Sequence, residues 1–478
     1  MSLDRTRLRP RWLHLGFGAF ARAHPLFVLH RGLMADPSGD WGVIVARLNS
    51  GQAELDALDQ AGGLYHVVEA DASGLSAAQV GCVIGSCHPA RDGAGALPGL
   101  IASPEMAVIS LTITEKGYCL GAEGLDLNHP AIRADLQGEG APRSAIGVLV
   151  AGLAQRRAAE LGGLTLMACD NLSGNGRKLA RAVLDYAGAT DPALAGWIGA
   201  QCRFPCSMVD RIVPAMTPEA HERISAHLGR DDPAAVICEP FLQWVIEDDF
   251  ATERPPLAAG GALLVGDVEP YEEMKLRMLN GAHTFLALLG GQAGLATVDA
   301  CMADPVFAAA VERFHRDEAA PSLPPLPGFD LAGYGAELRA RFANPALCHR
   351  TEQIASDTSQ KLPQRILAPI RWHLVERGTV PVLMALVLAS WLCWLSGRGD
   401  QGAALPFNDP EADALRARLA GLEPGPQLLR AYLHHYAAFA PDLTQDPRLY
   451  TALAEAHGAL RARGVRETLA TLLSEPAR

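Results

Sequence analysis

Lysine is scarce in this chain. Only four of its 41 basic residues are lysines, Lys116, Lys178, Lys275 and Lys361, and the other 37 are arginines. Arginine stays protonated in proteins, whereas lysine can lose its proton when it is desolvated or lies near another cation. The four lysines are therefore candidates for roles that arginine cannot perform.

A surplus of positive charge is also absent. The formal net charge is −12, which argues against nucleic acid or an anionic membrane surface as a partner. Apolar residues make up 49% of the chain and charged residues 20%, a balance that excludes disorder, collagen and coiled coil. A length of 478 residues predicts two or three domains with large cores. A small anionic substrate remains possible, because a local pocket of basic residues can be positive although the net charge of the chain is negative.

Metal-binding cysteine patterns and long apolar runs are missing. The closest pairs among the ten cysteines, Cys82/Cys87 and Cys202/Cys206, do not form a zinc motif, and free thiols indicate a reducing, cytoplasmic location. The N-terminus has no apolar signal-peptide core. The apolar run Val380–Leu395, of 16 residues, is short for a bilayer and predicts a buried core helix.

Strand and helix signals alternate in the first half of the chain. Strand-like runs at 12–15, 41–49, 106–114 and 164–171 lie between helical stretches, which predicts an α/β domain with a parallel sheet. From about Tyr271 onward the pattern is helical. We expect a Rossmann-type dinucleotide-binding domain over residues 1–268 and a mostly α-helical substrate and catalytic domain over 269–478.

A glycine turn follows the first predicted strand. It has the pattern GxGxxA and comprises Gly16, Phe17, Gly18, Ala19 and Phe20. Glycines let a backbone approach a pyrophosphate at a helix N-terminus, so we expect a dinucleotide here. Arg22 either faces a phosphate or is a solvated helix residue.

The second predicted strand lacks the acidic residue that usually binds the ribose of NAD. It ends with Arg47, Asn49 and Ser50, and the nearest carboxylate is Glu54. An arginine there can accommodate the extra phosphate of NADP, so the choice between NAD and NADP stays open.

The block from 272 to 283 carries the strongest catalytic pattern. On an ideal helix of about 100° per residue, Glu272, Lys275, Asn280 and His283 fall on one side, within about 140°. An amine could exchange the hydroxyl proton, an amide could polarise the oxygen and an imidazole could orient the substrate. The alternative is a hydrated interdomain surface.

Three further polar residues have structural alternatives. Asn171 ends a predicted strand, at the edge where ligands bind in such sheets, but could be a helix cap. Asp210 lies between two prolines and could form a salt bridge with Arg211. Lys361 lies in a predicted short loop and could be solvated.

These blocks together resemble the mannitol dehydrogenase family, the polyol-specific long-chain dehydrogenases. The resemblance runs from about Leu13 to beyond Arg365 and is carried by HLGFGAFARAH, SLTITEKGY, ACDNLSGNG, FPCSMVDRIVP, EPFLQWVIED, MKLRMLNGAHT and SQKLPQR. The chain most resembles the fructuronate reductase branch. It departs from the family at Ala21, where histidine is frequent, and at Ser50, where an acid is frequent.

The resemblance implies a metal-independent, NAD(P)-dependent dehydrogenase with its site between the two domains. Lys275 would be the acid/base, Asn171 and Asn280 would polarise the substrate oxygen, and Asp210 and His283 would bind hydroxyls. Lys361 would bind substrate too. A uronate carboxylate needs local cations, for which we expect Lys116, Lys361 or both, with Arg365 in reserve.

Three functions compete at this stage. The first is reduction of a linear hexuronate, and the second is a mannitol- or arabinitol-type polyol dehydrogenase. The third, a nucleotide-binding regulatory protein without catalysis, is disfavoured because Lys275, Asn280 and His283 are all present. In either enzyme reading the partner is a small sugar acid or polyol, and the chain is a monomer or a weak oligomer.

Overall fold

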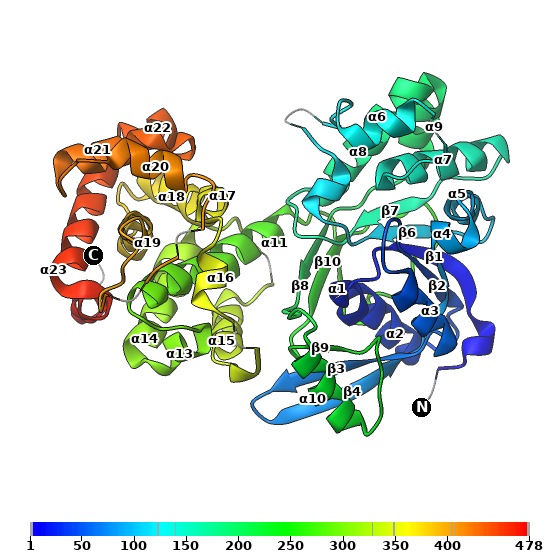
Figure 1. Ribbon diagram of the computed structural model, residues 1–478, viewed down its shortest axis with the longest axis horizontal. Helices are drawn as coiled ribbons and strands as arrows, with labels where there is room; N and C mark the ends of the chain where they lie inside the picture. The colour runs from blue at the N-terminus through cyan, green and yellow to red at the C-terminus, as the bar shows by residue number, and fades with distance from the viewer. Residues whose placement is uncertain are drawn as a thin grey trace. The chain divides into compact units, whose positions relative to one another are not determined.

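The computed structural model describes residues 3–121, 124–138, 140–326, 328–347, 349–402, 404–406 and 408–475. The chain divides into two compact units, residues 1–269 and 270–478, which run from blue to green and from green to red in Figure 1. The boundary expected from the sequence lies one residue from this division.

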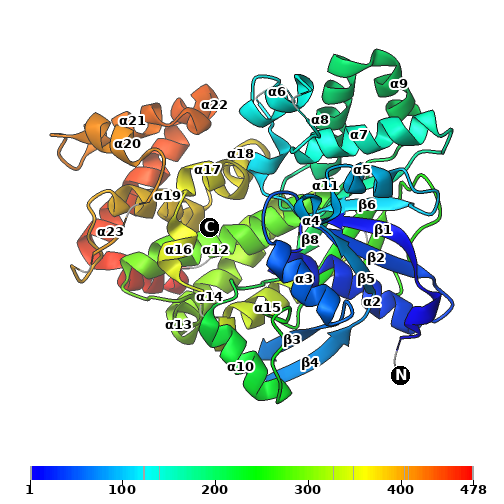
Figure 2. The ribbon, with the colours of Figure 1, turned by 45° about the vertical axis from the view of Figure 1, so that its right-hand side comes forward.

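A five-stranded sheet forms the centre of the N-terminal unit, and all of its strand pairs are parallel. Its order is β5-β2-β1-β6-β7. The strands are β1 (Arg9–Leu15), β2 (Trp41–Ala46), β5 (Val83–Cys87), β6 (Val108–Leu111) and β7 (Thr165–Ala168). Figure 2 shows β5, β2, β1 and β6 side by side. The predicted parallel α/β fold is confirmed, although β6 and β7 are shorter than their apolar runs.

Both faces of this sheet are covered by apolar side chains. Trp12 of β1 belongs to one buried cluster with Phe27 and Val43, whereas its neighbour Leu13 belongs to another with Ile109. Successive residues of a strand point to opposite faces, so this split shows a core on each side. Near-continuous apolar strands are typical of such doubly covered sheets.

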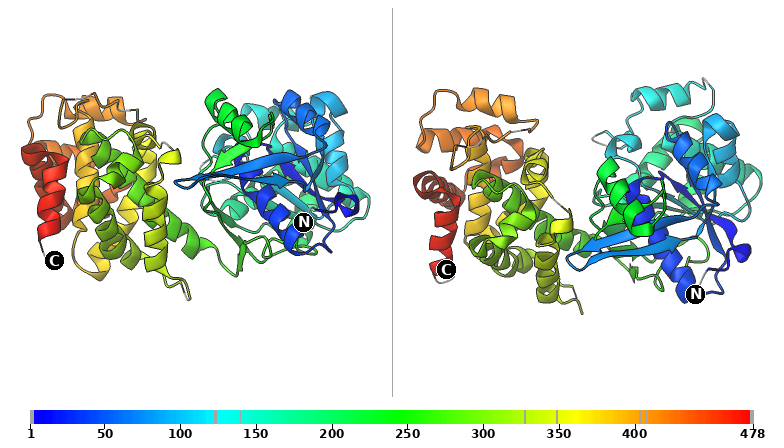
Figure 3. Two further views of the ribbon diagram at one scale, coloured as in Figure 1. Left: turned by 90° about the horizontal axis from the view of Figure 1, so that it is seen from below. Right: turned by 60° about the horizontal axis from the view of Figure 1, so that its bottom comes forward.

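Two three-stranded sheets extend the N-terminal unit. One has the order β4-β3-β9, with β3 (Tyr65–Asp71), β4 (Gly74–Val80) and β9 (Val236–Cys238). The other has the order β11-β10-β8, with β8 (Ser207–Asp210), β10 (Gln243–Glu247) and β11 (Leu263–Val265). The antiparallel β3–β4 hairpin projects from the body of this unit in Figure 3. Strand β4, which is mostly exposed and rich in small residues, gave no strand signal in the sequence.

Ten helices connect the described strands of this unit. They are α1 (Ala19–Ala23), α2 (Pro25–Ala35), α3 (Gln52–Gln60), α4 (Pro89–Asp92), α5 (Ala96–Ile101), α6 (Pro130–Leu136), α7 (Ala145–Ala158), α8 (Asn175–Thr190), α9 (Pro192–Gln201) and α10 (Pro218–Leu228).

The C-terminal unit is helical throughout its described part. Its α-helices are α11 (Glu269–Met274), α12 (Gly281–Phe285), α13 (Val298–Ala303), α14 (Pro305–Arg313), α15 (Leu331–Phe342), α16 (Thr351–Ala355), α17 (Thr358–Leu362), α18 (Ala368–Glu376), α19 (Val382–Trp394), α20 (Ala412–Leu419), α21 (Pro426–His435), α22 (Ala440–Thr444) and α23 (Pro447–Ser474). Helix α19 comes from the uncharged apolar run, is almost wholly buried and packs against α23, as predicted for a core helix. Among the described helices, none combines the length and apolarity that a membrane crossing needs.

Four π-helical segments interrupt the α-helices of the C-terminal unit within its described residues. They are η3 (Lys275–Asn280), η4 (Leu286–Gly290), η5 (Phe314–Ala319) and η8 (Pro363–Leu367). The segment η3 packs against both η5 and η8. Turns of this kind are rare and occur frequently at functional sites.

The prediction that Lys361 lies in a short loop is wrong. Lys361 lies in α17, and the helical backbone continues through Pro363, which opens η8, into α18. A proline normally breaks a helix because it lacks an N–H and clashes with the preceding turn. Here the wider hydrogen-bonding register of η8 accommodates the ring, so the helix continues.

A chain of buried hydrogen bonds joins β1 to β6. The Ser110 hydroxyl accepts a hydrogen bond from Trp12 Nε1 and lies 2.6 Å from His14 Nδ1. His14 Nε2 lies 3.0 Å from the Thr112 hydroxyl, which in turn donates to the Gly16 carbonyl at 2.7 Å. The pKa of His14 is lowered to about 4, chiefly by burial, so its ring is neutral in the folded chain at pH 7.

This neutral histidine makes the N-terminal unit sensitive to acid. An unfolded chain protonates His14 near its ordinary pKa of about 6.5, whereas the folded chain resists protonation down to about 4, so stability falls as pH drops through this window. The shift corresponds to about 3 kcal/mol. In His14→Gln we expect a smaller fall in the unfolding midpoint between pH 7 and pH 4.5 than in the unmutated protein. Equal falls would show that His14 does not govern the acid response.

Candidate active site

Four polar segments of the N-terminal unit leave its main sheet at one edge. Leu15 of β1 pairs with Ala46 of β2 and with Leu111 of β6, and Leu111 pairs with Ala168 of β7. Because the strands are parallel, the segments that follow these residues emerge together. Strand order reverses between β1 and β6, which is where open α/β sheets bind ligands.

The glycine turn follows β1 and its two glycines serve different needs. Gly16 has φ +106°, and a Cβ there would lie 2.2 Å from the Thr112 carbonyl oxygen. A Cβ at Gly18 would meet nothing within 4 Å. Gly16 therefore lets the turn lie against β6, whereas Gly18 leaves open space at the start of α1. Phe17 is buried against Tyr65, and Ala19 and Phe20 begin α1 half-buried.

Arg22 anchors this turn. Its guanidinium donates to the carbonyls of Gly18 at 3.3 Å and Ala234 at 2.7 Å, and lies 5.2 Å from the ring centroid of Phe17. Burial lowers its pKa, so the alternative of a solvated helix residue is wrong. The bonds tie the turn to the segment before β9.

An ion pair lies at the end of β2. Arg47 binds Glu54, a residue of the first turn of α3, and Ser50 is exposed beside them. A carboxylate, that of Glu54, thus lies near the position where the ribose-binding acid was expected, but it forms an ion pair with Arg47. Because Glu54 balances the charge of Arg47, Arg47 is a weaker candidate for binding the 2′-phosphate of NADP than the sequence indicated.

The blocks after β6 and β7 are joined to each other. The Tyr118 hydroxyl donates to the Asp170 carboxylate, with Tyr118 on the short 3₁₀ turn η2 (Glu115–Tyr118). Asn175 then donates to the carbonyls of Asp170 at 3.1 Å and Ser207 at 2.8 Å. These bonds fix the loop that presents Asn171, which is exposed, as is Lys116 on η2.

Asp210 ends β8 and is buried, with 3% of its surface exposed. The proposed salt bridge between Asp210 and Arg211 is absent. Arg211 instead binds the carboxylate of Glu69 and donates to the carbonyls of Ala23 and Glu239. Arg211 thus joins β3, α1 and the segment after β9.

The C-terminal unit holds the second group of candidates on one continuous helical run. Lys275 begins η3 and is 9% exposed, Asn280 ends η3 half-buried, and His283 in α12 is 8% exposed. The ideal-helix angles expected for them are wrong, because η3 is π-helical. A π turn pairs residue i with i+5, so it brings Lys275 and Asn280 closer to one face than an α-helix would.

Cationic side chains surround His283. Its pKa is lowered well below 6.5, first by burial and then by His349, Arg341 and Arg365. Its ring centroid lies 5.5 Å from that of His349. Among the described residues, none hydrogen-bonds its buried Nε2 atom. A neutral imidazole with a free nitrogen can exchange a hydrogen bond with a substrate hydroxyl.

Lys361 on α17 and Arg365 on η8 lie one helical turn apart. Arg365 donates to the Thr284 hydroxyl at 3.2 Å, and Thr284 donates to the Asn280 carbonyl at 3.0 Å. Burial lowers the pKa of Arg365 to about 10. The Lys361 ammonium donates to the carbonyls of Ile354 at 3.0 Å and Ser356 at 2.5 Å. Burial and then Arg365 lower its pKa to about 8, so Lys361 is not a solvated lysine.

The candidates therefore form two groups, one in each unit. Lys116, Asn171 and Asp210 belong to the N-terminal unit with the glycine turn, and the other substrate and catalytic candidates belong to the C-terminal unit. Sequence reasoning missed Arg341 and His349, which adjoin His283, because one arginine among 37 gives no signal. The described residues include no cluster of three His, Cys, Asp or Glu side chains suited to a metal ion.

Comparison with known proteins decides the family. Residues 10–259 match the mannitol dehydrogenase Rossmann domain, and residues 267–461 match the mannitol dehydrogenase C-terminal domain. The chain belongs to the mannitol dehydrogenase family. The resemblance found in the sequence is confirmed, and the chain is an oxidoreductase of that family.

Individual relatives extend over nearly the whole chain. The chain is 44% identical over 455 residues to the uncharacterized oxidoreductase YeiQ of Escherichia coli, covering 95% of this chain and 92% of that protein. It is 43% identical over 478 residues to D-mannonate oxidoreductase of the same organism, covering 98% and 97%. A solved Pseudomonas fluorescens mannitol 2-dehydrogenase, in ternary complex with NAD and D-mannitol, matches with a TM-score of 0.82 and 33% identity, covering 99% and 96%.

The two glycines of the turn should respond differently to one methyl group. In Gly16→Ala we expect a loss of at least about 2 kcal/mol in stability, because alanine disfavours φ +106° and its Cβ meets a carbonyl. In Gly18→Ala we expect near-normal stability but weaker binding of NADH. Thermal unfolding and fluorescence titration with NADH separate the two effects. Normal NADH binding by Gly18→Ala would contradict a cofactor against this turn.

Proposed function

We propose that the chain is an NAD-dependent dehydrogenase that interconverts the keto and hydroxyl forms of a linear hexuronate, D-fructuronate and D-mannonate. Extensive similarity to D-mannonate oxidoreductase supports this reading. The observation that carries it is the group of cationic side chains around His283. A hexuronate has a carboxylate that such cations can bind, and a hexitol has none.

The energetics of these cations favour an anionic substrate. Arg341 is 7% exposed, and burial lowers the pKa values of Arg365 and Lys361. Burying a charge is costly unless a partner of opposite sign offsets the lost hydration. For Arg365, a substrate carboxylate would supply that partner through charge-assisted hydrogen bonds.

The C-terminal unit supplies the proton and orients the substrate in this proposal. Lys275 acts as the acid/base, taking the hydroxyl proton in oxidation and returning it in reduction. Burial disfavours the charged form of an amine, which suits a base at neutral pH. Asn280 donates to the developing alkoxide, and His283 binds a neighbouring hydroxyl through its free Nε2.

The N-terminal unit contributes the cofactor site and three polar residues. The space at Gly18 and the turn anchored by Arg22 fit a dinucleotide at the edge where the strand order reverses. Bound NAD would accept or supply the hydride. Asn171 would join Asn280 in polarising the oxygen, Asp210 would bind a hydroxyl, and Lys116 would contact the substrate. NADP remains the alternative nucleotide.

A neutral polyol is the competing substrate. The mannitol 2-dehydrogenase similar to this chain was solved with D-mannitol, and its likeness extends over both units. A neutral polyol offers no carboxylate for Lys116 or Arg365 to bind. Rates with fructuronate, tagaturonate and fructose, each with NADH and NADPH, discriminate the two readings. Faster reduction of fructose than of fructuronate would favour the polyol dehydrogenase.

Removal of the Lys275 amine should affect chemistry alone. In Lys275→Ala we expect NADH binding and folding to be normal and kcat to fall about 10²- to 10⁴-fold, the range for loss of general acid–base catalysis. Lys178→Ala is a matched control, because Lys178 is an exposed lysine of α8. Near-normal turnover by Lys275→Ala would remove it from the proposed role.

Removal of the Arg365 charge should separate the two substrate classes. In Arg365→Gln we expect KM for fructuronate to rise about 10- to 100-fold, since a hydrogen bond to a charged group contributes about 1.5–3 kcal/mol. KM for fructose should change less than about 3-fold, because fructose offers no carboxylate. A parallel rise for both substrates would assign Arg365 to the support of α12 through Thr284 instead.

A further inference from the structure

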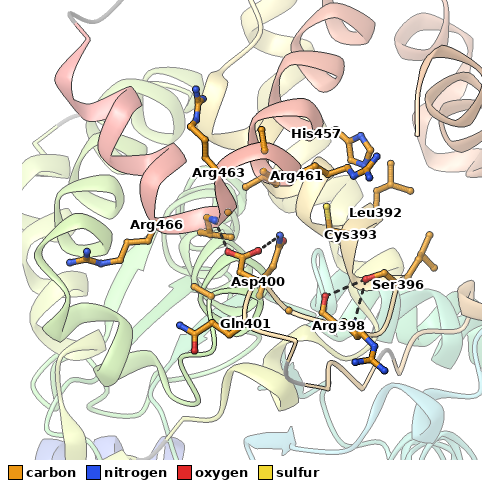
Figure 4. Close-up of a pocket in the computed structure, with 18 of the residues that line it drawn as sticks. Leu392, Cys393, Ser396, Arg398, Asp400, Gln401, His457, Arg461, Arg463 and Arg466 are labelled. Carbon is orange, nitrogen blue, oxygen red and sulfur yellow. Dashed lines mark hydrogen bonds between the residues drawn. The ribbon is translucent and has the colours of Figure 1, made fainter. Parts of the chain in front are cut away.

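A cavity of about 1250 Å³ lies within the C-terminal unit. Its walls are the end of α19 with the loop that follows, the middle of α23, and the segment from α20 to α21. Figure 4 shows the first two walls, with Leu392, Cys393 and Ser396 facing His457 and Arg461. Small-molecule sites usually measure about 300–1,000 Å³, so the cavity can hold a ligand of nucleotide size.

The cavity is distinct from the candidate active site. None of the residues predicted for catalysis or for substrate binding lines it. Its floor includes Gln292 and Ala293, which follow η4 at the far end of the helical run that begins with Lys275. A ligand here would touch this run beyond the residues assigned to the reaction.

The cavity wall is rich in arginine. Five arginines line it: Arg398, Arg416, Arg461, Arg463 and Arg466. Arg466 is bound by Asp304 at 2.6 Å and Arg416 by Asp413 at 3.4 Å. Within the part of the chain that the structure describes, the guanidinium groups of the other three have no carboxylate partner and no hydrogen-bond acceptor.

Three carboxylates line the wall, fewer than its five arginines. Asp304 binds Arg466, and Asp400 accepts hydrogen bonds from Gln292 Nε2 at 3.0 Å and from the Val465 N–H at 2.6 Å. The latter bond closes the kink of α23 at Gly464, whose φ is +72°. Glu467 is the remaining acidic side chain of the wall. Arg398, Arg461 and Arg463 therefore leave a local excess of positive charge in a chain of net charge −12.

A buried histidine gives independent support. His457 lines the cavity and is only 8% exposed, yet none of the described residues hydrogen-bonds its ring. Burial and then Arg461 lower its pKa. Figure 4 shows its ring beside the Arg461 side chain. A neutral imidazole next to a guanidinium can donate one N–H to an anionic oxygen while the arginine supplies the charge.

An apolar strip faces these polar groups. It is formed by leucines from several elements: Leu392, Leu395, Leu419, Leu428 and Leu460. Leu395 and Leu428 are partly exposed, and an organic phosphate can cover them with its carbon skeleton or base, which an inorganic ion lacks. Guanidinium forks match the geometry of phosphate oxygens.

We propose that this cavity is a second ligand site, which binds an organic phosphate of nucleotide size. Its phosphate groups contact Arg398 and Arg461, His457 donates to one phosphate oxygen, and the apolar part lies on the leucines. The site is separate from the dinucleotide-binding turn of the N-terminal unit.

Calorimetric titration of the full chain tests this proposal, with inorganic pyrophosphate and ADP as probes and NADH present at saturation to fill the dinucleotide site. We expect both probes to bind, and ADP at least as tightly as pyrophosphate. In the double variant Arg398→Gln/Arg461→Gln, affinity should fall about 10- to 100-fold or more, as expected for lost charge-assisted bonds. Arg418→Gln is the matched control, since Arg418 is an exposed arginine of α20 that does not line the cavity.

A second variant guards against a misfolded double mutant. Ala462→Glu adds a negative charge at an exposed position of the wall and should weaken both probes while the unfolding midpoint stays unchanged. Unchanged affinity in both variants, or no binding by the unmutated protein at millimolar probe, would overturn the proposal. Binding of pyrophosphate without ADP would reduce the cavity to a site for inorganic anions and would overturn it as well.

Discussion

The contact between the Gly16 backbone and the end of β6 is the constraint on which the N-terminal unit depends. The Gly16 N–H donates to Ala46 of β2, its carbonyl accepts from Thr112 after β6, and no room is left for a side chain. One residue thus connects three neighbouring strands at the point where their order reverses. The histidine-centred hydrogen bonds below it hold Thr112 in place, and Arg22 holds the other end of the turn.

In the C-terminal unit, the structure of the candidate site depends on charged side chains that are buried away from water. After burial, Arg341 and Arg365 lower the pKa of His283, and Arg365 lowers that of Lys361. The π turn η8 carries Arg365, and η3 ends at Asn280, three residues before His283. An α-helical path would rotate Lys275 and Asn280 apart, and a proline-terminated α17 would end before Arg365. Packing that tolerates irregular turns and crowded cations is costly without a compensating anion.

Patterns that depend on local periodicity could be predicted, and those that depend on tertiary contacts could not. Continuous apolar runs predicted the parallel sheet and the core helix α19, because both are buried on all sides. The pattern GxGxxA predicted the glycine turn. Strand β4 is mostly exposed and rich in small residues, so it gave no such signal. The Arg47–Glu54 pair and the Arg211–Glu69 pair join residues whose charges look unremarkable in a chain with 37 arginines. Because arginine is abundant, no single arginine of the site could be identified from its residue type. Because lysine is rare, only the lysines of the site could.

The scarcity of lysine acquires a physical meaning in the folded chain. Lys275 and Lys361 are the lysines of the C-terminal unit, and both are largely removed from water, whereas Lys116 and Lys178 are exposed. An arginine at position 361 would remain charged under any condition, and its planar fork would fit poorly between two carbonyls of one helix end. A lysine there can bind Ile354 and Ser356 and still release its proton beside Arg365. Beside Arg365 a cation gains from being able to lose its proton, and of the two basic residues that keep their charge at neutral pH in water, lysine has that ability and arginine does not.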